Sequence, residues 1–133
     1  MMFIKLLNII RNAAEDLPGG RELNFYSFLA GLIRLSNMPT EDISEMFEEQ
    51  EIQDEVLKCR EIIIQNGLTE DAVWHTVIDV LGNAVCLDNE ADGFKGFMGE
   101  FFAKNEGAAL SDFIPVALEN YGEELQNIKN GTR

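Results

Sequence analysis

The segment FKGFMGEFF, residues 94–102, carries the clearest structural pattern in the chain. Its apolar members stand at positions i, i+3, i+4, i+7 and i+8, which is the spacing of one face of an α-helix and not the alternation of a strand. They are Phe94, Phe97, Met98, Phe101 and Phe102. The segment therefore predicts an amphipathic helix that packs its apolar stripe against a core, and Gly107 is expected to end this helix.

Apolar residues also recur every three or four positions on both sides of this segment, and helix-breaking residues separate the runs. The further predicted helices cover about residues 2–16, Asn24 through Leu35, Thr40 through Phe47, Ile52 to Asn66, Thr69 through Val85, and Ser111 or Asp112 to Ile128. Asn24, Thr40 and Thr69 are expected to act as N-caps, because their side-chain oxygens can accept hydrogen bonds from the first backbone N–H groups.

Three stretches are expected to interrupt the helices or to lie outside them. The apolar phase slips near Gln50–Gln53, which predicts a break there, and Asp88–Asp92 is interpreted as a polar loop. Residues 129–133 are expected to fray. The run Trp74–Val80 is dense in β-branched residues and also permits a strand, but apolar residues at both odd and even positions favour a helix.

These patterns predict a single all-α domain over residues 1–133, built as a compact bundle of about six to eight short helices. A length of 133 residues is typical of one domain. The hydrophobic content of 46% argues against intrinsic disorder. Gly31 stands inside the second predicted helix, which suggests that another helix packs closely there.

The sequence gives three indications of the compartment. The opening run Met1–Ile10 is apolar like a signal peptide, but Lys5 and Asn8 interrupt it and no A-x-A cleavage site follows. No apolar segment approaches the roughly 20 residues that span a bilayer. Cys59 and Cys86 are too few for a disulfide scaffold and match no zinc pattern. We therefore expect a cytoplasmic protein with reduced cysteines.

Residues that carry catalysis or bind metals are scarce. The chain has one histidine, His75, and contains no P-loop, no G-x-S-x-G and no H-E-x-x-H. A Cys–His pair brought together by folding is the remaining enzymatic possibility. We expect no enzyme activity, no cofactor and no metal site.

The stretch DNEADG, residues 88–93, has a spacing similar to the opening of an EF-hand calcium loop, which also needs a bidentate glutamate at position 12. Counted from Asp88, position 12 is Gly99, and Glu100 comes one residue late. On a helix one residue turns a side chain by about 100°, so the main ligand is misplaced. We interpret the stretch as an acidic loop and not as a calcium site.

The net charge of −14 is concentrated in one part of the chain. Residues 36–93 hold fifteen carboxylates against two bases, Lys58 and Arg60, and the densest part runs from Glu41 to Glu55. Glu41, Glu45 and Glu48 are expected on one helical face. Because proteins bind phosphate backbones through lysine and arginine, nucleic acids and anionic membranes are poor partners for this chain.

Charge of one sign raises the local potential and can speed the encounter with a basic partner. We therefore expect a small cytoplasmic inhibitor of the immunity or antitoxin type, which binds a basic toxin or nuclease and covers its cationic cleft. In size, acidity and lack of catalytic residues the chain is similar to bacterial toxin-immunity proteins. The expected contact residues are Glu41, Glu45, Glu48, Glu49, Glu51, Asp54 and Glu55, with Asp88, Glu90 and Asp92 as a second patch.

Two other interpretations stay open. An acidic run can be an ordinary solvated face. The chain can also be a helical adaptor or a homo-oligomeric assembly module that uses the Phe94–Phe102 helix as its interface. We favour a monomer over a homodimer, and the salt dependence of partner binding separates the hypotheses.

Overall fold

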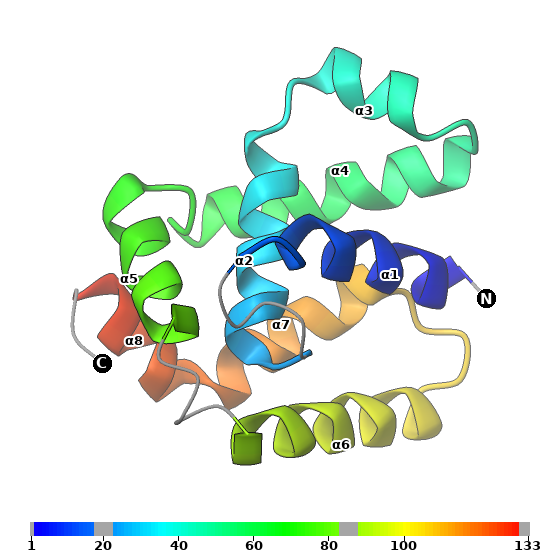
Figure 1. Cartoon of the computed structure of the whole chain (residues 1–133). Helices are drawn as coiled ribbons and strands as arrows, with labels where there is room; N and C mark the ends of the chain where they lie inside the picture. The colour runs from blue at the N-terminus through cyan, green and yellow to red at the C-terminus, as the bar shows by residue number, and fades with distance from the viewer. Residues whose placement is uncertain (1, 18–22, 83–87, 131–133) are drawn as a thin grey trace.

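The computed structural model describes residues 2–17, 23–82 and 88–130 of the chain (Figure 1). The helices within these ranges are α1 (Met2–Ala14), α2 (Phe25–Asn37), α3 (Thr40–Met46), α4 (Gln50–Gln65), α5 (Asp71–Gly82), α6 (Asp88–Lys104), α7 (Leu110–Asn120) and α8 (Gly122–Lys129). No strand occurs within them, so the predicted all-α class is confirmed, and the run Trp74–Val80 is helical.

Helix α2 lies at the centre of the molecule and contacts α1, α4, α5 and α6 (Figure 1). Apart from Arg34 and Asn37, every residue of α2 is buried. The predicted N-cap of this helix is confirmed. The Asn24 Oδ1 accepts a hydrogen bond from the Ser27 N–H, and the Ser27 Oγ accepts one from the Asn24 N–H, each at 2.9 Å. This capping box satisfies backbone N–H groups at the start of α2, which is buried and where water cannot bind them.

Gly31 allows the close approach of α1 to α2. A methyl group on its Cα would lie 2.7 Å from the Cγ2 of Ile10 and would also clash with the Ile10 carbonyl oxygen. Because Ile10 is fully buried, neither atom can move aside at low cost. The expectation of close helix packing at Gly31 is thus confirmed. The crossing places Ile9 and Ala13 of α1 beside the C-terminal half of α2.

The apolar stripe of α6 packs into an aromatic core around Phe113 of α7. The ring centroids that lie 5.3 to 6.0 Å from that of Phe113 belong to Phe28, Phe94, Phe97, Phe101 and Phe102. Phe94 and Met98 are buried, and the other three members of the stripe are half-buried. The prediction that this stripe faces the core is confirmed.

Two predictions about segment boundaries on the C-terminal side are wrong. The expected loop Asp88–Asp92 belongs to α6, which begins at Asp88, and acidic residues in a first turn complement the helix dipole. The expected helix from residue 111 to Ile128 is divided into α7 and α8 at Tyr121. The backbone of Tyr121 leaves the helical conformation, and its ring stacks on that of Phe25 with centroids 4.5 Å apart.

Two predicted caps are displaced. Pro39 and not Thr40 occupies the N-cap position of α3, and no side-chain hydrogen bond caps that end. Helix α5 begins at Asp71, with the first backbone bond accepted by the Glu70 carbonyl oxygen, so Thr69 lies outside it. The break predicted near Gln50–Gln53 occurs just before it, over residues 47–49.

Candidate functional site

The acidic residues of the middle of the chain gather along α3 and the start of α4. Six of the seven predicted contact residues in this region are exposed, and Asp42 is exposed as well. We call this group the acidic edge: Glu41, Asp42, Glu45, Glu48, Glu49, Glu51 and Asp54. In Figure 1, α3 lies at one end of the molecule above α4, so the acidic edge is presented at that end.

The local sequence explains why α3 exposes its carboxylates. Helix α3 has seven residues, and the chain buries Ile43 from it and Phe47 from just after it. With these two side chains turned inward, the charged positions of the helix face water. The expectation that Glu48 shares a helical face with Glu41 and Glu45 is wrong, because α3 ends at Met46 and Phe47 is extended.

The acidic edge keeps most of its charge. Among the residues that the structure describes, its one ion pair joins the Lys5 Nζ to the Glu49 Oε1 at 3.2 Å, with both side chains 58% exposed. Such an exposed pair contributes about 0–1 kcal/mol. The nearby Arg60 donates a hydrogen bond to the Thr40 Oγ1 at 3.3 Å. The charge at this end of the molecule is therefore available to a partner.

Glu55 is the exception among the predicted contact residues. It is 4% exposed, and its Oε1 accepts a hydrogen bond from the backbone N–H of Ser111 at 2.8 Å. The expectation that Glu55 belongs to the exposed acidic surface is therefore wrong. Its spacing could have revealed this, because Glu55 follows Ile52 by three positions and precedes Cys59 by four, both on the buried stripe of α4.

The second predicted patch is separate from the acidic edge. Asp88, Glu90 and Asp92 belong to the first turns of α6, and their side chains lie outside the described part of the structure. Figure 1 shows α6 at the end of the molecule opposite α3. The fold therefore does not join the two groups into one surface, and the second patch stays a prediction.

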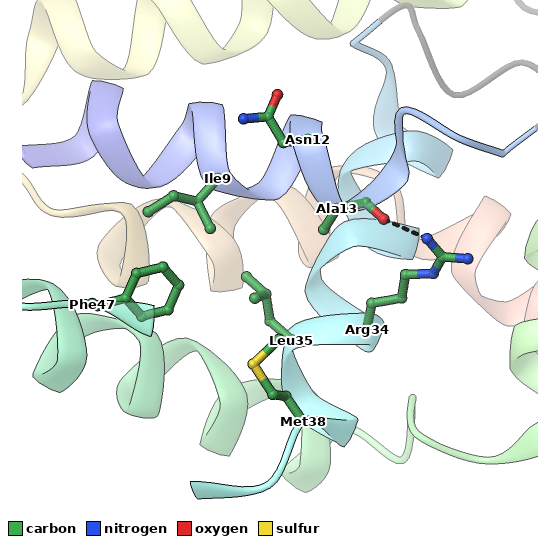
Figure 2. A pocket seen from close by; sticks show the side chains of 7 residues that line it. All are labelled: Ile9, Asn12, Ala13, Arg34, Leu35, Met38 and Phe47. Carbon is green, nitrogen blue, oxygen red and sulfur yellow. Dashed lines mark hydrogen bonds between the residues drawn. The ribbon is translucent and has the colours of Figure 1, made fainter. Parts of the chain in front are cut away.

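A pocket of about 370 Å³ opens next to the acidic edge (Figure 2). Its lining residues come from α1, α2, the residue after α2 and the α3–α4 connection. They are Ile9, Asn12, Ala13, Arg34, Leu35, Met38 and Phe47. We call it the Phe47 pocket, because Phe47 also begins the exposed connection that carries Glu48 and Glu49. Sequence reasoning did not find it, since no motif links these separate segments.

Arg34 forms one wall of the Phe47 pocket and is held in place by three contacts. It donates hydrogen bonds to the Ala13 carbonyl oxygen at 2.9 Å and to the Asp16 Oδ1 at 2.6 Å. Its guanidinium also lies 5.5 Å from the ring centroid of Trp74, a cation–π distance. The hydrogen bond from Arg34 holds the pKa of Asp16 below its ordinary value. Arg34 is thus already matched by protein groups.

A second pocket of about 390 Å³ lies on the other side of Arg34 and Met38, which line both pockets. Its remaining walls include Asn37, Asp71 and Trp74. These walls carry more polar groups than the Phe47 pocket does. The Phe47 pocket is therefore the better candidate for an apolar ligand group.

The histidine and the cysteines considered as catalytic candidates in the sequence do not form a reactive pair within the described structure. His75 is exposed, and burial raises the pKa of the Cys59 thiol, which keeps it protonated. Cys86 lies outside the described residues. Within residues 2–17, 23–82 and 88–130 no three His, Cys, Asp or Glu residues are grouped to hold a metal ion.

The described helices are also too short or too polar to cross a bilayer. The described structure thus presents an exposed acidic edge with an apolar pocket beside it. Comparison with protein-family models, with curated proteins and with solved structures found no match for this chain.

Proposed function

We propose that this protein is a small acidic cytoplasmic inhibitor of the immunity or antitoxin type. It binds a basic toxin or nuclease and covers the cationic cleft of that partner. The observation that supports this function is the acidic edge. It has seven exposed carboxylates, and among the described residues only that of Glu49 forms an ion pair.

The arrangement suits recognition of a cationic cleft. Carboxylates can replace the phosphates that such a cleft binds, through charge-assisted hydrogen bonds to lysine and arginine. Like charges close together on a surface raise the potential and speed encounter at low salt. The backbone of the acidic edge is held by Ile43 and Phe47, which are buried. Binding therefore orders the carboxylate side chains without also having to order the chain that carries them.

The test removes part of the charge of the acidic edge with side chains of nearly the same shape. The triple variant Glu41→Gln, Glu45→Gln, Glu48→Gln removes three charges, and the control Glu106→Gln, Glu119→Gln, Glu123→Gln removes three exposed charges elsewhere. Each protein is immobilised, host proteins are captured at low salt and eluted with a salt gradient, and the eluted basic proteins are identified. The captured protein is then purified, and its affinity and activity are measured.

We expect the acidic-edge variant to lose at least about tenfold in affinity for that protein, while the control keeps it. The unmodified chain should inhibit the activity of the partner. Equal affinity of both variants, or a captured partner whose activity the chain leaves unchanged, would contradict the proposed function.

The assembly function through the Phe94–Phe102 helix remains an alternative proposal. Against this alternative, its apolar stripe contacts Phe113 and other core rings, and Phe94 and Met98 are buried. A dimer that is insensitive to salt in light scattering would favour this alternative over the inhibitor.

A further inference from the structure

We infer that the Phe47 pocket takes one apolar side chain of the basic partner, flanked in that partner by lysine or arginine. This inference rests on the proposed function and specifies how the partner is recognised. The acidic edge would then attract the partner. The pocket would bind the partner's apolar side chain, the anchor, and so fix how the two proteins are aligned.

The pocket has the chemistry of an anchor site. Ile9, Leu35, Met38 and Phe47 converge on it from three segments, as Figure 2 shows. Leu35 and Phe47 are buried, whereas Ile9 and Met38 are half-buried and keep apolar surface in contact with water. An apolar side chain from a partner would cover this surface, which is the usual source of affinity at interface hot spots.

The charged group of the lining, Arg34, already has partners within the protein and does not favour a negatively charged ligand. The guanidinium of Arg34 already donates to Asp16 and to the Ala13 carbonyl oxygen, and it faces Trp74. A partner carboxylate would therefore compete with an existing ion pair and would also meet the acidic edge. An apolar group meets neither obstacle.

The acidic residues around the pocket favour basic residues on both sides of the apolar side chain in the partner. Phe47 lines the pocket, Glu45 precedes it by two positions, and Glu48 follows it directly, both exposed. Glu49 is paired with Lys5 of α1 at 3.2 Å, and a partner cation can replace that exposed lysine at little cost. Lysine or arginine beside the anchor therefore meets carboxylates within one or two residues of the pocket wall.

The same charge argues against a second copy of this chain as the occupant. Two chains of net charge −14 repel each other, and docking at this site would bring the second copy against the acidic edge. A basic protein with an exposed apolar residue fits both features of the site. Met38 adds tolerance for the shape of the anchor, because its side chain is unbranched and adaptable.

The experiment uses three synthetic pentapeptides as probes, Lys-Lys-Phe-Lys-Lys, Lys-Lys-Ser-Lys-Lys and Glu-Glu-Phe-Glu-Glu. Each is titrated into the ¹⁵N-labelled full chain, and backbone amide shifts are followed by NMR. We expect the first peptide to shift amides at Ile9, Leu35 and Phe47 and to bind about tenfold more tightly than the serine peptide. The serine peptide should shift the acidic edge alone, and the acidic peptide should shift neither.

Pocket-filling variants complete the test. Ala13→Leu enlarges a lining residue of the pocket, and Ala103→Leu is the matched control at an exposed position of α6. We expect Ala13→Leu to remove the preference for phenylalanine over serine and Ala103→Leu to keep it. Met38→Trp fills the pocket from the opposite wall and provides the same readout should Ala13→Leu fail to fold.

The outcomes separate this inference from the proposed function. Equal binding of the phenylalanine and serine peptides, with the amides of the pocket unmoved, would overturn the anchor pocket. If the Glu41→Gln, Glu45→Gln, Glu48→Gln variant still lost its basic partner in that case, the proposed function would stand. A preference for the acidic peptide would overturn both.

Discussion

The carboxylate of Glu55 in α4 accepts a hydrogen bond from the backbone N–H of Ser111 in α7 at 2.8 Å, although the two residues are 56 positions apart. Ser111 is the second residue of α7, so its N–H is one of those that no helical carbonyl satisfies. The negative charge also lies at the positive end of the helix dipole. Glu55 therefore joins α4, whose first turns carry Glu51 and Asp54 of the acidic edge, to α7 and its aromatic core.

Removal of this carboxylate should destabilise the fold. Glu55→Ala removes the acceptor of the half-buried Ser111 N–H, and we expect a loss of about 1–3 kcal/mol in the free energy of unfolding. Glu55→Gln keeps an oxygen acceptor and should lose less. Urea unfolding followed by circular dichroism measures both variants. Glu61→Ala, at an exposed position of α4, is the control and should stay within about 0.5 kcal/mol; equal losses at residues 55 and 61 would rule out this role.

Substitution by alanine should change the stability of the protein in opposite directions at Gly31 of α2 and at Gly96 of α6. Gly31→Ala forces a methyl group against Ile10, and we expect a loss of at least about 2 kcal/mol from overpacking. Around Gly96 a methyl group would meet no atom within 4 Å. Gly96→Ala should therefore stabilise the protein by up to about 1 kcal/mol through helix propensity. Thermal unfolding of both variants tests this, and a stable Gly31→Ala protein would contradict the close approach.

Local spacing was enough to predict most helices and some of their ends. The period of three to four residues identified the core stripe of α6, and Asn24 was recognisable as a cap because its side-chain oxygen can accept a backbone hydrogen bond at the start of an apolar run. The end of α4 at Asn66 and Gly67 also follows from local chemistry, since Gly67 adopts a φ of +69° that favours glycine.

Features that depend on tertiary contacts were not predictable in the same way. The break between α7 and α8 occurs where the Tyr121 ring stacks on Phe25, 96 positions earlier in the chain. The spacing of Glu55 could have shown that it is buried, but its hydrogen bond to Ser111 of a distant helix could not be read from the sequence. The Phe47 pocket likewise exists only once α1 crosses α2, so the exposed half of the candidate site was predictable and the pocket was not.

The ion pair between Arg34 and Asp16 should make stability depend on pH in the acid range. The hydrogen bond from Arg34 keeps the pKa of Asp16 lower in the folded protein than its ordinary value of 3.8. Its stabilisation is therefore complete above pH 3.8 and is lost as the pH falls through the folded value. We expect unfolding midpoints to fall more steeply with acid in the wild type than in Asp16→Asn. The control Glu15→Gln, at an exposed neighbouring position, should keep the wild-type slope, and an identical slope in Asp16→Asn would refute the pairing.

Phe113 should be the most sensitive position of the aromatic core. Its ring is fully buried and lies within 6.0 Å of five other phenylalanine rings, measured between centroids. Phe113→Ala should cost about 3–5 kcal/mol, because the large cavity cannot close around rigid rings. Val116→Ala, on the same helix and 39% exposed, should cost less than about 1 kcal/mol. Chemical unfolding compares the two, and similar losses would show that α6 does not depend on this ring.

Two glutamates of α3 should have opposite effects on stability, although both serve the acidic edge. Glu41 is in the first turn of α3, where its charge complements the helix dipole, whereas Glu45 lies near the C-terminal end, where its charge opposes it. We expect Glu41→Gln to lower and Glu45→Gln to raise the free energy of unfolding, each by about 0.3–1 kcal/mol. Both effects should vanish in about 1 M NaCl, where the Debye length is about 3 Å. If Glu45→Gln also weakens binding of the basic partner, the charge at that position is retained for function at the expense of stability; stabilisation that persists in high salt would instead point to a packing effect.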